Sequence, residues 1–184
     1  FLGKNQPKKL AILDIGCGTG KLMEELQDYG IVHGLDASQQ AIKFCRRRGL
    51  KRLYKSKFPR LSIQLSQKKF DLIICLDVLE HISDDAKAMT SIGQLLKPKG
   101  QLILTVPAYS WLFSYWDEMS GHYRRYSSQQ LKGLMHASGL TPIKLTFLYS
   151  FLLPLAIPFR YIKHRLSKHQ APSSDLINFH PLAN

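Results

Sequence analysis

The chain has few cysteines, few acidic residues and no long hydrophobic run. Its 184 residues include three cysteines, Cys17, Cys45 and Cys75. An odd number at well-separated positions gives no disulfide framework, so we expect a reducing, cytoplasmic environment. No apolar stretch reaches the roughly 20 residues of a transmembrane helix, and the sequence shows no internal repeat. These features favour a cytoplasmic protein without a membrane span.

Acidic residues are missing altogether between Asp36 and Asp71. Overall, 26 Lys and Arg face 13 Asp and Glu, which gives a formal net charge of +13. The interval without acids contains many of the basic residues: Lys43, Arg46, Arg47, Arg48, Lys51, Arg52, Lys55, Lys57, Arg60, Lys68 and Lys69. A positive field of this kind attracts nucleic acid and anionic membrane alike.

What is present is a hydrophobic content of 45%, enough for one sizeable core. The pattern predicts strands at 10–15, 31–35, 51–54, 71–76, 101–106 and 142–148. It predicts helices at 20–29, 38–48, 84–97 and 127–138, the last with a capping box of Ser127 and Gln130. Strands that alternate with helices indicate an α/β fold, a doubly wound, Rossmann-like parallel sheet with helices on both faces. We expect no full helix at 55–69. We expect one domain over 1–166 and a polar C-terminal tail over 167–184.

A glycine-rich turn follows the first predicted strand, in the sequence Leu-Asp-Ile-Gly-Cys-Gly-Thr-Gly at 13–20. Glycine reaches positive φ without penalty and leaves room for a ligand against the backbone. A dinucleotide fingerprint needs a third glycine at position 21, where Lys21 stands, and the P-loop spacing is absent. The turn therefore predicts a small-molecule site of another kind.

Two further strands also end in polar residues. The segment 31–38 ends its apolar run at Asp36, where a carboxylate can accept hydrogen bonds from both ribose hydroxyls. The alternative for Asp36 is an acid that stabilises the start of the next helix. The segment 70–82 is a buried-strand pattern that ends in Asp77, Glu80 and His81.

Four features together resemble the motifs of class I S-adenosylmethionine (SAM) dependent methyltransferases. They are Asp14-x-Gly16-x-Gly18-x-Gly20, the strand ending at Asp36, the segment 70–82, and the turn and strand at 97–107. The resemblance is to the group related to ubiquinone and menaquinone biosynthesis methyltransferases. It implies SAM as methyl donor and S-adenosylhomocysteine as product. The family usually adds a seventh, antiparallel strand, which we expect to be missing from this chain.

The resemblance also implies the residues that bind the cofactor: Asp14, Gly16, Cys17, Gly18, Gly20, Asp36, Ala37, Leu76 and Asp77. Asp14 would reach the methionine ammonium, and the glycines would support the amino-acid moiety. Leu76 would offer its backbone carbonyl to the same ammonium, and Ala37 would lie against adenine. An acid that many relatives use to bind the adenine amino group is absent from 55–60, where Ser56 is a weak substitute.

Aromatic and ionisable side chains are dense in the segment 107–126, which we expect to cover the acceptor. It contains a His-x-Arg-Arg-Tyr-Ser element that begins at His122 and is similar to one in many bacterial methyltransferases. We predict His122 as general base, oriented by Asp117, because neutral imidazole is suited to deprotonation near pH 7. The alternative is that the two residues pair structurally and pin the loop.

A metal ion is not expected from the sequence. Relatives that methylate catechol-like quinone precursors carry Glu-x-x-Glu-His after the fourth strand and can bind a divalent cation. Here Asp77 replaces the first Glu. A cation, if present, would bind at Asp77, Glu80 and His81.

The acceptor is left open among several classes. The run 145–159 has no charge and is followed by basic residues, which favours a lipid-linked acceptor or peripheral contact with anionic membrane. A soluble small molecule is the other main possibility, with O- or C-methylation favoured in both cases. Two alternatives remain open. One is an RNA methyltransferase that uses the basic surface, and the other is a SAM-binding scaffold without catalysis. RNA is disfavoured because the sequence has no appended RNA-binding module.

Overall fold

The computed structural model describes residues 9–148 of the chain. Within them, five strands form one parallel sheet: β1 (Leu10–Ile15), β2 (Gly30–Asp36), β3 (Leu53–Lys55), β4 (Phe70–Leu76) and β5 (Leu96–Thr105). The described helices are α1 (Lys21–Leu26), α2 (Gln39–Arg47), α3 (Ile63–Ser66), α4 (Asp85–Leu95), α5 (Tyr115–Met119) and α6 (Ser128–Ala137). Two 3-10 turns are η1 (Leu79–His81) and η2 (Ser110–Leu112).

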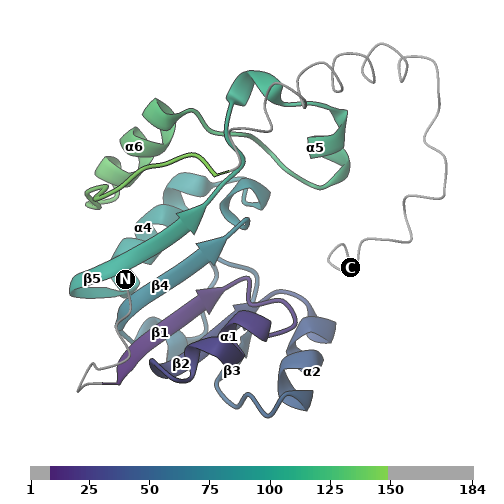
Figure 1. The fold of residues 1–184 in the computed structure, drawn as a ribbon, viewed down its shortest axis with the longest axis vertical. Helices are drawn as coiled ribbons and strands as arrows, with labels where there is room; N and C mark the ends of the chain where they lie inside the picture. Colours follow the sequence, from purple (N-terminus) through teal and green to yellow (C-terminus); the bar gives the residue numbers. More distant parts are fainter. Residues whose placement is uncertain (1–8, 149–184) are drawn as a thin grey trace.

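The strand order is β3-β2-β1-β4-β5. The chain builds outward from β1 to β3 and then returns to place β4 on the other side of β1. In open sheets of this type, ligands bind at the carboxyl ends of the strands where the order reverses. Figure 1 shows the arrowheads of β1, β4 and β5 pointing the same way, with α5 beyond the ends of β4 and β5. The expected site therefore lies between β1 and β4 at this edge.

Helices cover both faces of the sheet, as predicted. Successive residues of a strand point to opposite faces. Ile12 of β1 is buried in one cluster with Met23 of α1 and Ile42 of α2. The next residue, Leu13, is buried in a second cluster with Met89 of α4. Because both faces are buried, the central strands are continuous apolar runs rather than alternating ones.

The start of α6 also behaves as predicted, and an acid begins α4. Ser127 accepts from the Gln130 backbone, and the Gln130 side chain accepts from the Ser127 backbone, which completes the capping box of α6. Asp84 caps α4 by accepting from the backbone N–H of Lys87. As expected, the 55–69 connection holds no full helix, because α3 is a single turn.

Three predicted boundaries are wrong. The predicted helix 20–29 ends at Leu26, the predicted helix 84–97 ends at Leu95, and β5 begins at Leu96 rather than at 101. The turn residues 97–100 lie within β5 as an irregularity in its register with β4, and Lys99 there has a positive φ of 65°. The sequence showed the turn but not that β5 pairs with β4 on both sides of it.

The predicted strand 142–148 is also wrong, because these residues form no strand. Ile143 and Leu148 are 83% and 66% exposed, so this apolar pattern is not packed against the sheet. Pro142 lacks a backbone N–H and is unfavourable for pairing at the start of the segment.

Several predictions fall outside the described residues. These are the domain boundary at 166, the tail 167–184, the missing seventh strand and the apolar run beyond Leu148. Among residues 9–148, no helix combines the length and the apolar character needed to cross a bilayer.

Candidate functional site

The glycine-rich turn after β1 has the backbone that its sequence predicts. Gly16, Gly18 and Gly20 have φ values of 76°, 51° and 79°, a region that L-residues with a side chain rarely adopt. A Cβ at Gly16 would lie 2.3 Å from Cγ2 of Val78. The turn after β1 therefore touches the segment after β4, and a side chain at Gly16 would clash there.

Asp36 lies at the end of β2 and is tied to this turn. Its Oδ2 accepts from the backbone N–H of Gly18 at 2.9 Å, and its Oδ1 accepts from that of Ser38 at 2.7 Å. The helix cap is Ser38, whose hydroxyl accepts from the backbone N–H of Ala41. Asp36 is therefore not needed as the cap, and its two oxygens have lone pairs left for a ligand.

Asp14 is the second buried acid at this edge. Its side chain is nearly inaccessible. Burial, followed by repulsion from Asp36, raises the pKa of Asp14 to about 7. A nearby cation would favour the ionised form, so the position suits a ligand that brings a positive charge such as an ammonium group.

The other predicted cofactor residues divide into two kinds. Ala37, Leu76 and Asp77 are exposed at the carboxyl ends of β2 and β4. Cys17 is different, because its side chain is buried in the core beside α1 and α2 and burial raises the pKa of its thiol. Only the backbone of Cys17 can therefore face a ligand at the turn.

Asp77 adopts a positive φ of 53° and is held towards β5. Its Oδ1 accepts from the hydroxyl of Thr105 at 2.9 Å, and its backbone N–H donates to the Thr105 carbonyl at 3.2 Å. These contacts fix the carboxylate at the sheet edge.

The segment 107–126 closes on itself above this edge. Its two ends are joined, because Tyr126 donates its backbone N–H to the carbonyl of Pro107 at 2.9 Å and forms an isolated parallel β-bridge with Ala108. Between these ends lie η2 and α5. The segment is a compact loop over the ends of β4 and β5 (Figure 1).

Most of the His-x-Arg-Arg-Tyr-Ser element anchors this loop. Arg124 forms an ion pair with Asp85 at 2.6 Å and donates to the carbonyl of Ser83 at 2.6 Å. The hydroxyl of Tyr126 donates to Asp85 at 2.9 Å. These contacts join the loop to the start of α4, which gives Arg124 and Tyr126 a structural role.

Asp117 and His122 lie close together, as the sequence predicts. Nδ1 of His122 is 3.4 Å from Oδ1 of Asp117, within ion-pair distance but without hydrogen-bond geometry. The same Oδ1 is bound by Arg125 at 2.6 and 2.8 Å, and Oδ2 accepts from the backbone N–H of Ser114. Burial would raise the pKa of Asp117, but Arg125 and Ser114 outweigh it and lower that pKa. Arg125 is the partner that sequence analysis missed.

Among the residues that the structure describes, Glu80, His81 and His122 form a group of metal-type ligands. One ligand atom from each lies within 4.8 Å of those of the other two. The ring centroids of His81 and His122 are 4.6 Å apart, and the two ring planes are nearly perpendicular. Glu80 is 1% exposed, its Oε2 has no hydrogen-bond partner, and burial raises its pKa to about 7. The donor set fits a divalent cation, but Asp77, which the sequence placed in it, is not a member.

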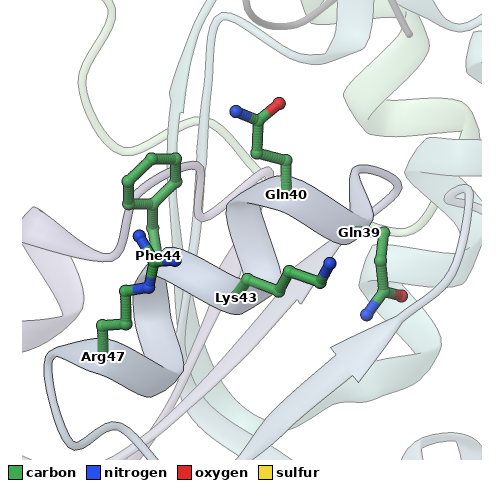
Figure 2. A pocket seen from close by; sticks show the side chains of 5 residues that line it. All are labelled: Gln39, Gln40, Lys43, Phe44 and Arg47. Atoms are coloured by element: carbon green, nitrogen blue, oxygen red, sulfur yellow. The ribbon is translucent and has the colours of Figure 1, made fainter.

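A separate hollow of about 460 Å³ lies along α2. Figure 2 shows the side chains that line it: Gln39, Gln40, Lys43, Phe44 and Arg47. All of them belong to one helix, and none is a predicted site residue. The convergent polar groups lie instead at the ends of β1, β2 and β4, where we place the candidate active site.

Comparisons with known proteins identify the family of the chain. A family model described as a methyltransferase domain matches residues 1–145. The chain is 32% identical over 99 residues to a ubiquinone biosynthesis O-methyltransferase of Alkalilimnicola ehrlichii, which covers 51% of this chain and 40% of that protein. It is 35% identical over 99 residues to the Nitrosococcus oceani protein of the same name, with 51% and 42% covered. The matched part spans less than half the length of these relatives.

Solved structures share the fold. A SAM-dependent methyltransferase from Mesorhizobium loti superposes with a TM-score of 0.66 at 19% identity and covers 84% of this chain and 85% of that one. Magnesium protoporphyrin IX methyltransferase from Synechocystis, solved with S-adenosylhomocysteine, gives 0.59 at 18% identity, with 74% and 66% covered. With the family match over most of its length, the chain belongs to the class I SAM-dependent methyltransferases, whose methyl donor is SAM.

Proposed function

We propose that this domain transfers the methyl group of SAM to a small or lipid-linked acceptor, with O- or C-methylation favoured. The observation that carries the proposal is the arrangement of the glycine turn, Asp14 and Asp36 at one switch point of the sheet. In this account Asp36 accepts from the ribose hydroxyls and Asp14 accepts from the methionine ammonium. The backbone of the turn supports the amino-acid moiety.

The chemistry needs positioning more than acid–base groups. Methyl transfer from a sulfonium is an in-line displacement, in which a new bond to the acceptor forms as the carbon–sulfur bond breaks. Holding the two reactants in line supplies much of the acceleration. The closed loop 107–126 lies over the strand ends, where it would hold the acceptor and exclude water.

An acceptor hydroxyl must also lose its proton. We propose that His122 takes it, with Asp117 as a positioning residue. Four members of the motif hold the loop or cap α6 through side-chain hydrogen bonds: Arg124, Arg125, Tyr126 and Ser127. Among the described contacts, the side chain of His122 makes no such hydrogen bond. The remaining member, Tyr123, is exposed. The competing interpretation is structural, since the shortest contacts of Asp117 are with Arg125 and Ser114.

The acceptor class can be tested with methyl-labelled SAM. The protein would be incubated with a solvent-extracted lipid fraction and, separately, with the aqueous small-molecule fraction of cells. Label in the lipid fraction would support a lipid-linked acceptor and peripheral membrane contact, and label in the aqueous fraction a soluble one. No label in either, with SAM still bound, would contradict the proposal.

RNA remains a second candidate because of the basic region. The residues between Asp36 and Asp71 include eleven Lys and Arg and no acid. Some of these are engaged within the protein: Arg48 pairs with Glu24 at 3.0 Å, and Lys69 donates to the carbonyl of Gln94. Nuclease-sensitive label in an RNA fraction would favour this function instead.

A further inference from the structure

We propose that Glu80, His81 and His122 form a binding site for one divalent transition-metal ion, with His122 in the place that sequence similarity would give to Asp77. The inference deepens the proposed function and rests on it only for what the ion does in catalysis. Binding of the ion itself can be measured without SAM or acceptor.

An unsatisfied buried atom is the first argument. Oε2 of Glu80 is buried and has no hydrogen-bond partner. Leaving a buried polar atom unpaired costs about 1–3 kcal/mol, and more for a charged group. Glu80 is one of the three residues whose ligand atoms converge within 4.8 Å. A cation among them would supply the missing partner.

The surroundings of the two imidazoles are the second argument. Metal-binding histidines commonly hold their other ring nitrogen against a carbonyl or carboxylate oxygen. Nδ1 of His81 lies 3.2 Å from the carbonyl of Gly121, and His122 lies beside the carboxylate of Asp117. Arg125 holds that carboxylate in turn. Each ring therefore has an oxygen beside it that would orient it.

The backbone brings the three residues together from two segments. Glu80 and His81 lie in η1, just after β4, whereas His122 belongs to the loop that returns from α5. The backbone N–H of Tyr123 donates to the carbonyl of Glu80 at 2.8 Å, which joins the two segments next to the cluster. Asp77 is held away by Thr105.

The donor set selects the class of cation. Two imidazoles and one carboxylate suit Zn²⁺, Fe²⁺ or Co²⁺, whereas Mg²⁺ and Ca²⁺ prefer oxygen ligands. A bound divalent cation would lower the pKa of an acceptor hydroxyl, and His122 would then be a ligand rather than a free base. Replacing His122 abolishes turnover in either role, so the two roles must be separated by metal binding.

The experiment is a calorimetric titration of the metal-free protein with Zn²⁺, repeated with Co²⁺ to record its visible absorption. The wild-type protein should bind one ion, and excess Mg²⁺ should not displace it. His122→Ala and Glu80→Gln should each weaken binding by at least about tenfold. Asp77→Asn is the matched comparison, because it removes a nearby charge that acts on Glu80 but no ligand of the cluster, and it should weaken binding of the ion far less than the two ligand variants.

The same preparations would be titrated with SAM, and thermal unfolding without metal would show that each variant is folded. Absence of wild-type binding would overturn the inference, as would unchanged binding by folded His122→Ala or a loss in Asp77→Asn equal to that in Glu80→Gln. SAM binding without ion binding would leave the proposed function standing. Failure to bind SAM would count against the proposed function alone.

Discussion

Replacing Asp36 by Ala is the sharpest test of the cofactor site. The carboxylate is fixed before any ligand arrives, because the backbone N–H groups of Gly18 and Ser38 each bind one of its oxygens. A hydrogen bond to a charged group contributes about 1.5–3 kcal/mol. Two ribose hydroxyls would share one carboxylate, and interactions within one network are not additive. We therefore expect a total loss of about 1.5–3 kcal/mol, which raises the Kd for SAM about 10- to 150-fold.

The assay is isothermal titration calorimetry with SAM and with S-adenosylhomocysteine. Both should lose the same affinity, since Asp36 acts on the ribose that they share, and NADH should not bind. Asp28→Ala is the matched control because it removes the same charge from an exposed position near the end of α1. Thermal unfolding would show whether the loss of the Gly18 and Ser38 contacts disturbs the fold. If Asp36→Ala is folded and binds SAM as tightly as the control, the ribose assignment is refuted.

Four further predictions concern the same geometry. His122→Asn should abolish turnover and leave the SAM affinity unchanged, as measured by product formation and calorimetry on one sample. Gly16→Ala should reduce the free energy of unfolding by at least about 1 kcal/mol, measured by urea denaturation, because its Cβ would meet Val78 and its φ is positive. The affinity for SAM should fall as the pH drops below about 7, by up to about tenfold per unit, because protonation of Asp14 removes the partner of the ammonium. The raised pKa of Asp14 also means that stability of the free protein falls as the pH rises from about 4 to about 7, and Asp14→Asn should remove that part of both pH profiles.

The sheet and the cofactor edge could be predicted from the sequence because their signals are local. A buried parallel strand is a continuous apolar run, and the turn after β1 needs glycine for its backbone, so both appear within a few residues. The positions of Asp14 and Asp36 at the sheet edge follow from the ends of such runs. The predicted strand 142–148 shows the limit, since an apolar pattern does not reveal whether a pairing partner is available.

The acceptor side could be predicted only in part. The density of ionisable groups in 107–126 drew attention to His122 and Asp117, and they do lie together. The sequence could not show that Arg125 takes up the same carboxylate, or that the loop returns over η1 to place His122 beside Glu80. Asp117 and Arg125 are 8 positions apart, whereas the contacts between η1 and the loop join residues about 40 positions apart. Neither pairing has a spacing that a linear pattern reveals.

The central claim is that this domain is a methyltransferase and not a SAM-binding scaffold. The most direct measurement is the formation of S-adenosylhomocysteine when the purified protein and SAM are added to a dialysed cell extract supplemented with its small-molecule and lipid fractions. We predict formation above that of the extract alone, and none above it with His122→Asn. Tight SAM binding with no S-adenosylhomocysteine formed in any fraction would contradict the claim and indicate a binding protein.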